Sequence, residues 1–312
     1  MYTVHMLKIL FNTVLGVILI FVWSRFVDFG QILSILKTTN PIYIVSFVFF
    51  FGLAGALRGL RFKILLNKYH IPTKDVIMLT YLAQFLSFMV PLRIGELSKS
   101  VYLTSQFNLP LGKAVVWVFI DRFLDFLIII ATIAILMQFI PTVLPAKFLP
   151  IVLLVLAGFS LGFFLAIAKG DLIKKIKFTH TIIDGFEILR GDIKKLIGIL
   201  LFTLVILVVD GMVWWSAFSA LSTNLGIFKS MLGNGLSALT FLIPSAPGYV
   251  GSAEAAGLAV FGGVLGYEAN LASAATVLMH IITTTCLLVF GITSLYLLKF
   301  DLGAVWRKLL KK

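Results

Sequence analysis

Long runs of apolar residues dominate this chain and restrict the folds open to it. A helix needs roughly 20 residues to cross a bilayer core about 30 Å thick. Six runs approach or exceed that length: residues 7–26, 41–57, 114–138, 150–168, 196–221 and 269–298. They predict an all-α polytopic membrane protein with six full transmembrane helices.

Composition agrees with a lipid environment. Of the 312 residues, 60% are apolar and only 12% are charged, and the mean hydropathy is +1.09. A water-soluble domain carries about a quarter charged residues. The first run follows Lys8 without a small-residue cleavage pattern, so we expect a retained span and not a signal peptide.

Two further apolar stretches are interrupted. Residues 76–103 contain Pro91 and Gly95, and residues 231–267 contain Pro244, Gly248 and Gly251. Broken helices at membrane depth are tolerated only where protein or water satisfies the freed backbone groups. We therefore expect two re-entrant helical hairpins at these stretches.

The distribution of basic residues supports these hairpins and sets an orientation. If both hairpins return to their starting side, 19 Lys and Arg residues fall in one set of loops: 1–8, 58–75, 104–113, 169–195 and 299–312. Only four fall in the other set: 25–40, 139–149 and 222–230. Because cytoplasmic loops are enriched in Lys and Arg, both termini are predicted to be cytoplasmic.

The order of spans predicts an inverted repeat within a single membrane domain, residues 1–312. Residues 7–138 and 150–298 each contain span, span, hairpin and span, and an odd number of crossings per half gives them opposite orientations. The loop 169–195 has helical spacing of apolar residues among charges. It indicates an amphipathic helix on the cytoplasmic leaflet, with a solvated linker as the alternative.

Ionisable residues inside a membrane are costly, at roughly 2.5–3.5 kcal/mol each on insertion scales. Here they recur in sets: Arg93, Glu96 and Lys99; Asp121, Arg122 and Asp125; and singly Asp210, Glu254 and His280. They predict either buried ion pairs, such as Arg93 with Asp125 or Arg122 with Glu96, or a site for a charged headgroup. Half-helices after Pro91 and Gly248 would add unpaired N–H groups that favour an anion.

Other features of the sequence are less specific. Arg58 and Arg61, at the end of the second span, suit a leaflet-surface anchor or contact with a lipid phosphate. Two glycine pairs, Gly52/Gly55 and Gly158/Gly162, suit close helix packing. One cysteine, Cys286, and four scattered histidines predict no disulfide, no metal site and no cofactor.

Four motifs resemble the lysylphosphatidylglycerol synthase transmembrane-region family, also described as flippase-like membrane proteins. They are RGLRF at 58–62, VPLRIGELSKS at 90–100, DRFLD at 121–125 and PSAPGYVGSAEAAG at 244–257. The chain departs from the family pattern at Gln84, at Tyr249 and at His280, where Asn, a second Gly and a basic residue are common. The resemblance implies lipid handling without the cytosolic aminoacyl-transfer domain.

These observations predict a flippase-like protein of the cell membrane that moves an anionic or phosphate-bearing lipid between leaflets and is not an enzyme. The predicted substrate-binding residues are Arg58, Arg61, Arg93, Glu96, Lys99, Asp121, Arg122, Asp125, Asp210, Pro244, Gly248, Gly251, Glu254 and His280. The alternatives are a membrane-embedded transferase acting on polyprenyl-phosphate glycolipids and a non-transporting partner of a separate synthase. Candidate partners are thus the anionic lipid, a lipid-modifying enzyme and a second copy of the chain; nucleic acid is not expected.

Overall fold

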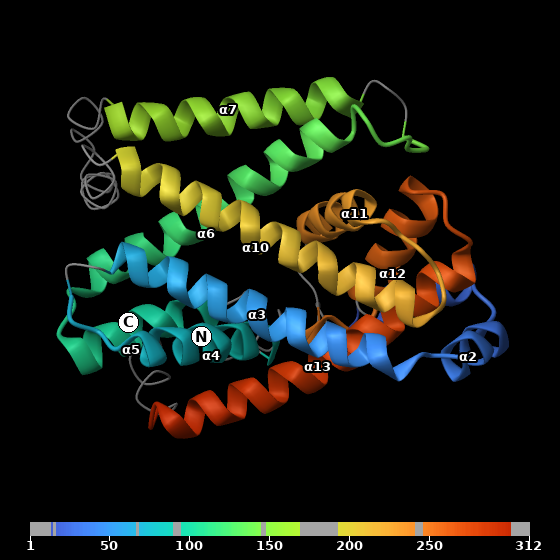
Figure 1. Cartoon of the computed structure of the whole chain (residues 1–312), viewed down its shortest axis with the longest axis horizontal. Coiled ribbons are helices and arrows are strands. Elements are labelled where there is room, and N and C mark those ends of the chain that lie inside the picture. The colour runs from blue at the N-terminus through green and yellow to red at the C-terminus, as the bar shows by residue number, and fades with distance from the viewer. Residues whose placement is uncertain are drawn as a thin grey trace.

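The computed structural model describes residues 14, 17–66, 69–89, 95–144, 148–168, 193–240 and 246–300. All regular structure in these residues is helical (Figure 1). The longer helices are α3 (Pro41–Leu65), α6 (Leu111–Leu136), α7 (Phe148–Ala168), α10 (Ile193–Ala220) and α13 (Ala269–Leu297). The shorter ones are α2 (Phe29–Lys37), α4 (Thr73–Met89), α5 (Gly95–Phe107), α11 (Ile227–Thr240), η2 (Pro247–Tyr249), α12 (Ser252–Gly257) and η3 (Leu258–Val264).

Three of the described helices are both long enough and apolar enough to cross a membrane: α3, α13 and the segment Leu196–Ala220 of α10. A fourth span would be formed by Val17–Ser24 together with α2, which are bent by 88° relative to each other. Helix α6 has 26 residues, but it carries Asp121, Arg122 and Asp125. The helical membrane-protein class is confirmed, whereas six full crossings remain a prediction.

The second span is longer than the predicted 41–57. Helix α3 begins at Pro41, capped by the Asn40 side chain, and continues to Leu65. Arg58 and Arg61 therefore lie inside a helix and not in a loop, and Arg61 is fully buried. The interpretation of Arg61 as a leaflet-surface anchor is wrong, because the helix turns this side chain toward its neighbours in the bundle.

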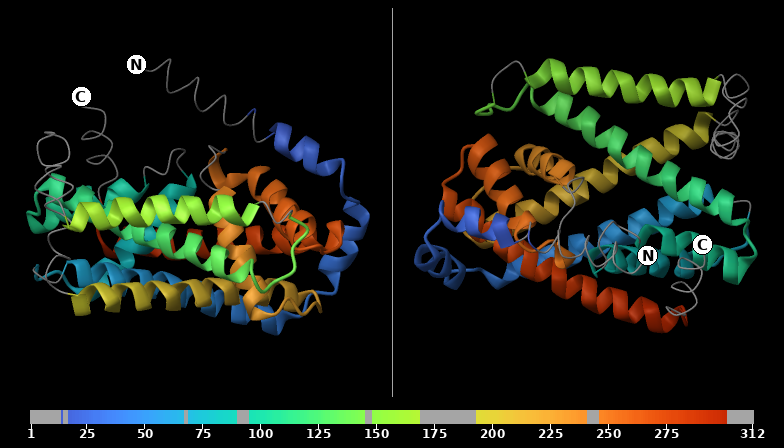
Figure 2. Two further views of the ribbon diagram at one scale, coloured as in Figure 1. Left: turned by 90° about the horizontal axis from the view of Figure 1, so that it is seen from above. Right: turned by 180° about the vertical axis from the view of Figure 1, so that it is seen from behind.

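Helix α2 occupies a segment that the sequence placed in an outer loop. Its N-cap is Asp28, whose carboxylate accepts hydrogen bonds from the N–H groups of Gly30 and Gln31. Asn270, at the start of α13, accepts from the Asp28 N–H (2.7 Å) and donates to the Gln31 side chain (2.6 Å). These contacts hold α2 against the end of the bundle opposite α5 (Figures 1 and 2).

Each interrupted stretch consists of separate helices. Residues 76–103 fall in α4 and α5, and residues 231–267 fall in α11, η2, α12 and η3. The second break contains Gly248 (φ +71°) and Gly251 (φ +82°), a left-handed conformation that glycine adopts without steric cost. Pro91, Arg93 and Pro244 lie outside the described residues, as does the predicted amphipathic segment 169–195 apart from residues 193–195, which begin α10.

The two halves of the chain pack in matching ways. Helices α3 and α10 run side by side through the centre and form the most extensive contact between the described elements (Figure 1). Helix α3 packs on α4 as α10 packs on α11, and α5 packs on α6 as α12 and η3 pack on α13. Helix α4 also packs on α13, as α11 packs on α6. The α4–α5 and α11–α12 regions lie toward opposite ends of the central helices (Figures 1 and 2).

Glycines permit some of these close approaches. A Cβ atom at Gly55 would lie 2.1 Å from the Tyr81 ring, so this glycine lets α4 rest directly on α3. At Gly158 and Gly162, no described atom outside the helix lies within 4 Å of such a Cβ. The packing role predicted for that second pair is therefore wrong in this structure, because its surface on α7 has no described neighbour.

Candidate functional site

A buried ionic cluster centres on Arg61. This side chain reaches from α3 to α6, where its Nε donates to Asp121 Oδ1 at 2.9 Å and its Nη1 donates to Asp125. It also donates to Thr203 Oγ1 of α10 at 3.0 Å and to the Asp121 carbonyl at 3.3 Å. The planar guanidinium suits several oxygen partners at once. With no exposed surface, Arg61 is positioned to join three helices and not to meet a ligand.

The cluster continues into α5 through Lys99. Its ammonium nitrogen lies 3.0 Å from Glu96 and 3.9 Å from Asp121, and it sits 5.1 Å from the centre of the Phe62 ring. Lys99 is also fully buried. The three-residue spacing of Glu96 and Lys99 places both on the face of α5 that meets α6. The contact of Lys99 with Asp121 ties the first interrupted stretch to the following helix.

Arg122 differs from the other cations because it is partly exposed. Its guanidinium lies 2.9 Å from Glu96 and 3.3 Å from Asp125, so the Arg122–Glu96 pair predicted from the sequence is confirmed. One third of the side chain (33%) is accessible, and its Nε has no hydrogen-bond partner among the described residues. Both carboxylates that pair with Arg122 also have a second cation, Lys99 or Arg61. Arg122 can therefore engage a ligand without leaving either carboxylate unpaired.

Arg58 forms a separate pair with Asp210 across the contact of α3 with α10. With this pair added to the cluster around Arg61, four described cations (Arg58, Arg61, Lys99 and Arg122) face four described anions (Glu96, Asp121, Asp125 and Asp210). Their formal charges cancel. Removing one member of a buried pair is costly because a charge remains uncompensated, so most of this cluster stabilises the helix packing.

A second polar group lies at the other broken stretch. His280 of α13 contacts Glu254 Oε1 through Nδ1 (2.5 Å) and the Gly248 carbonyl through Nε2 (2.8 Å). The other Glu254 oxygen accepts a hydrogen bond from the Gly251 N–H at 2.8 Å. This N–H at the start of α12 is thus not free for a lipid phosphate, contrary to the expectation for the half-helix after Gly248. The protein's own carboxylate occupies that position.

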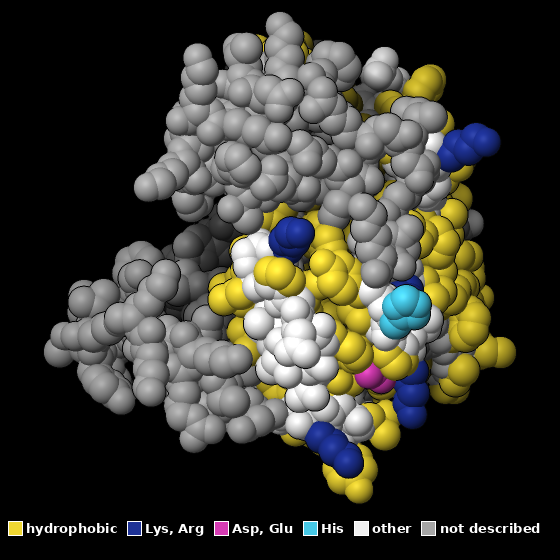
Figure 3. All heavy atoms as spheres, turned by 90° about the vertical axis from the view of Figure 1, so that its left-hand side faces the viewer, with side chains coloured by type: hydrophobic (Ala, Val, Ile, Leu, Met, Phe, Trp, Pro, Cys, Tyr) yellow, Lys and Arg dark blue, Asp and Glu magenta, His cyan; other side chains and the backbone are white. Residues whose placement is uncertain are grey.

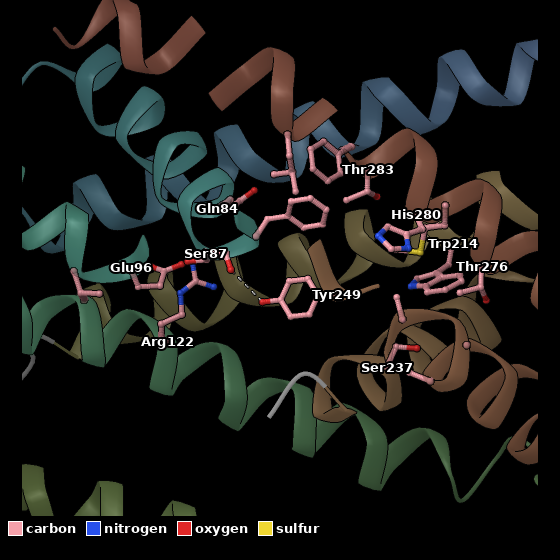
Figure 4. Close-up of a pocket in the computed structure, with 18 of the residues that line it drawn as sticks. Gln84, Ser87, Glu96, Arg122, Trp214, Ser237, Tyr249, Thr276, His280 and Thr283 are labelled. Atoms are coloured by element: carbon pink, nitrogen blue, oxygen red, sulfur yellow. Dashed lines mark hydrogen bonds and ion pairs between the residues drawn. The ribbon is translucent and has the colours of Figure 1, made fainter. Parts of the chain in front are cut away.

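A cavity of about 640 Å³ connects these two polar groups. Glu96 and Arg122 lie at one end of it, and His280, Trp214 and Thr276 lie at the other (Figure 4). Volumes of this order are typical of small-molecule and cofactor sites. The cavity therefore offers a space of headgroup size between the two halves of the chain.

Several cavity-lining polar groups have no hydrogen-bond partner in the described residues. They are the hydroxyls of Ser87, Ser237 and Thr283 and the Nε of Arg122. Buried polar atoms in proteins are usually paired, and an unpaired one calls for an explanation. These atoms have almost no exposed surface, so a polar ligand would pair with them only after a shift of the cavity wall.

The cavity includes three of the predicted substrate-binding residues: Glu96, Arg122 and His280. Arg58, Arg61, Lys99, Asp121, Asp125 and Asp210 form the ion pairs behind or beside it, and Gly248, Gly251 and Glu254 shape the break next to it. Sequence reasoning missed Ser87, Tyr249, Ser237, Thr276 and Thr283, which also line it. Tyr249 alone carried a signal, since it lies between the two glycines of the break.

The fold and cavity define a helical membrane protein with a partly open, mostly apolar cavity between its two halves, whose wall carries a few polar and charged side chains. The chain matches the family described as the lysylphosphatidylglycerol synthase TM region over residues 9–291, and it belongs to that family. The match covers the transmembrane region of the family and confirms the resemblance seen in the four motifs. A search of curated proteins found no match.

Proposed function

We propose that this protein moves a phosphate-bearing lipid, aminoacylated or glycosylated, between the leaflets of the cell membrane without ATP hydrolysis. The observation that carries the proposal is the cavity at the junction of the two halves, in which Arg122 and three hydroxyls have unused hydrogen-bonding capacity. Moving a polar headgroup through hydrocarbon has a high free-energy cost unless polar groups of the protein replace the water that the headgroup loses. The cavity supplies such groups.

Arg122 is the proposed phosphate contact. A guanidinium binds phosphate oxygens in a planar, bidentate manner, and one third of the Arg122 side chain is exposed for such a contact. When a phosphate arrives, Glu96 keeps its pair with Lys99 at 3.0 Å. The internal ion pairs thus let one cation exchange partners while the cluster stays compensated.

The acyl chains would remain against the apolar part of the cavity wall. Leu97, Val115 and Phe119 line the cavity at the side of Arg122, and their side chains are between 36% and 50% exposed. Lipid tails favour such a surface because it is as apolar as the bilayer interior. A lipid could therefore keep its tails in the membrane while its headgroup enters the polar site.

The proposed architecture is an inverted repeat with two re-entrant hairpins. It is supported by the matching contacts of α3 with α4 and of α10 with α11, and by the hairpin regions lying at opposite ends. Three basic residues of the predicted inner loop 58–75 (Arg58, Arg61 and Lys63) lie within α3; without them 16 of the 19 remain, against four in the predicted outer loops. Described Lys and Arg side chains stand out on the end that carries α5, which we assign to the cytoplasm (Figure 3).

The transferase alternative requires a carboxylate that is free to act as a base. Glu96 and Asp125 are the candidate bases, but Glu96 contacts two cations, Lys99 and Arg122, and Asp125 contacts Arg61 and Arg122. Neither carboxylate is therefore free to take a proton from a substrate. For this reason we favour transport over group transfer, and we propose no enzymatic activity.

The test is lipid movement in proteoliposomes that contain a fluorescent phosphatidylglycerol. Losing a charge-assisted hydrogen bond costs roughly 1.5–3 kcal/mol, so Arg122→Gln should slow movement about ten- to a hundredfold. Arg122→Lys keeps the charge but loses the planar, bidentate guanidinium. Its rate of lipid movement should therefore lie between those of the wild type and Arg122→Gln. Lys113→Gln is the matched control, since Lys113 is an exposed cation on the same helix.

Each outcome points to one function. Equal rates for the wild type and Arg122→Gln, both folded, would contradict the transport role of this site. A lipid product of altered mass after incubation would favour the transferase. Capture of a lipid-modifying enzyme without any lipid movement would favour the docking alternative. Mass spectrometry of co-purified lipid would identify the substrate class.

A further inference from the structure

His280 lies near the middle of α13, where it faces the break between η2 and α12 (Figure 4). It lines the cavity and is half-buried, with 15% of its side chain exposed. Both of its ring nitrogens contact oxygen atoms: Glu254 Oε1 at 2.5 Å and the Gly248 carbonyl at 2.8 Å. The identity of these partners determines how many protons the group holds.

A backbone carbonyl can only accept a hydrogen bond, so Nε2 of His280 must carry a proton. In a neutral imidazole, Nδ1 would then present a lone pair. That lone pair would face the Glu254 carboxylate oxygen at 2.5 Å, an arrangement of two acceptors that repel each other. A second proton must therefore lie between Nδ1 and Oε1. The pair holds one proton more than a neutral histidine and an ionised glutamate.

From this geometry we infer that His280 and Glu254 together form a proton-binding site, and that its proton couples lipid movement to the transmembrane proton gradient. The coupling rests on the proposed transport function, whereas the proton site does not. With the proton bound, the pair is neutral overall and can lie at membrane depth at little cost. Without it, an uncompensated carboxylate remains next to a neutral ring.

Release of the proton has a structural consequence. The proton passes from between the two side chains to water in the cavity, and the two acceptors then separate. His280 is the contact that joins α13 to Gly248 and to Glu254. Gly248 and Gly251 have positive φ angles, so the break can change direction there without a steric penalty from a side chain. Proton release thus frees the break at Gly248 and Glu254 from His280, while α12 and η3 stay packed on α13.

The same position is where the two interrupted stretches meet. The Phe88 ring of α4 contacts the His280 ring edge-on, with ring centres 6.2 Å apart, and lies 5.9 Å from the Tyr249 ring of η2. The Tyr249 hydroxyl also lies within 3.5 Å of the Ser87 carbonyl. A change at His280 therefore reaches both walls of the cavity that hold the headgroup in the proposed function.

In the described cavity wall, no further charged side chain is free to pair with His280 or Glu254. Glu254 of α12 and Tyr249 of η2 are the ionisable neighbours on the break. The other charged residues that line the cavity, Glu96 and Arg122, pair with each other at 2.9 Å. Helices α3, α4 and α10 present the neutral side chains Phe51, Phe88 and Trp214 to the cavity. In the described cavity wall, the charge of Glu254 is therefore balanced through His280.

The proton site is tested directly by nitrogen-15 NMR of histidine-labelled full-length protein in lipid nanodiscs, with the His280 signals assigned by comparison with His280→Gln. We expect two protonated ring nitrogens at neutral pH. In Glu254→Gln the amide can donate to Nδ1, so a neutral ring satisfies every contact and the extra proton should be lost. A neutral His280 ring in the wild type below about pH 6, where a free histidine is already charged, overturns the proton site.

Coupling is tested by imposing a pH gradient across proteoliposomes that contain a fluorescent phosphatidylglycerol. One proton per lipid shifts the leaflet ratio by up to about tenfold per pH unit, or about 1.4 kcal/mol. We expect this shift in the wild type and in His70→Gln, a control at an exposed loop histidine. It should be absent from Glu254→Gln and disappear with a protonophore.

The two measurements separate the possible failures. A wild-type protein that moves lipid with no response to the gradient overturns the coupling, and a protonated His280 is then a structural ion pair. A folded protein that moves no lipid under any condition contradicts the proposed function instead. The NMR result decides on the proton site in either case.

Discussion

Replacement of Arg61 by Met should destabilise the protein strongly. Arg61 is fully buried and donates to two carboxylates, to Thr203 and to a backbone carbonyl. Without it, Asp121 keeps only the Lys99 ammonium at 3.9 Å among the described cations, and Asp125 keeps only Arg122 at 3.3 Å. The described ion pairs, with Arg58 and Asp210 included, then hold four anions against three cations, so one buried negative charge remains uncompensated among them.

The expected cost follows from that count. Removing one partner of a buried ion pair typically destabilises a protein by about 3–5 kcal/mol. For a chain of this size, such a loss lowers the melting temperature by on the order of 10 °C. The assay is thermal unfolding of the purified protein in detergent or nanodiscs, followed by tryptophan fluorescence. Trp117 and Trp214, on α6 and α10, lie in the two helices that Arg61 joins to α3.

A compensating variant separates charge imbalance from lost packing. Arg61→Met with Asp121→Asn restores equal numbers of cations and anions, and replacing a whole buried pair with neutral groups is often close to neutral in stability. We expect the double variant to recover more than half of the loss. A single variant that melts within about 1 °C of the wild type would refute the reasoning, since the pairs would then be worth no more than exposed ones.

Three further predictions concern packing, anchoring and orientation. Gly95→Ala should destabilise the protein, because the added Cβ would lie 2.2 Å from the Ser87 backbone nitrogen, whereas Gly158→Ala meets no described atom and should leave the melting temperature unchanged. Asn270→Ala removes two hydrogen bonds that hold α2, worth about 1 kcal/mol each, so amide exchange should accelerate in α2 and not in α3. In a background without the native cysteine, an impermeant maleimide should label His70→Cys only from the cytoplasm and Thr38→Cys only from outside, since they lie at opposite ends of α3. Labelling of both from one side would contradict the topology.

Helix boundaries were largely readable from the sequence. The runs 114–138, 196–221 and 269–298 correspond to α6 (111–136), α10 (193–220) and α13 (269–297), with ends displaced by at most three residues. The length of an apolar run and the positions of Pro and Gly predict helix boundaries directly, because both depend on residues that are close in sequence. The end of α3 was missed because Arg58 and Arg61 are read as a loop when judged by charge alone.

Helix α2 was missed for a related reason. Its nine residues are too few to cross a bilayer, and they follow a charged segment, so a pattern based on span length places them in a loop. The Asp28 cap was visible in the sequence as a helix-start signal. The contact with Asn270, 242 residues further along, was not.

The pairing of charges required the tertiary structure. The sequence alone determined that this chain is a helical membrane protein, that ionisable groups lie within its apolar stretches, and that two of these stretches are interrupted. It did not determine that Arg61 meets Asp121 and Asp125 across 60 and 64 residues, or that Arg58 meets Asp210 across 152. Nor did it show that Arg122 faces a cavity. Helix formation depends on residues that are close in sequence and can be predicted from local patterns. The partner of a buried charge depends instead on which helix faces pack together in the tertiary structure.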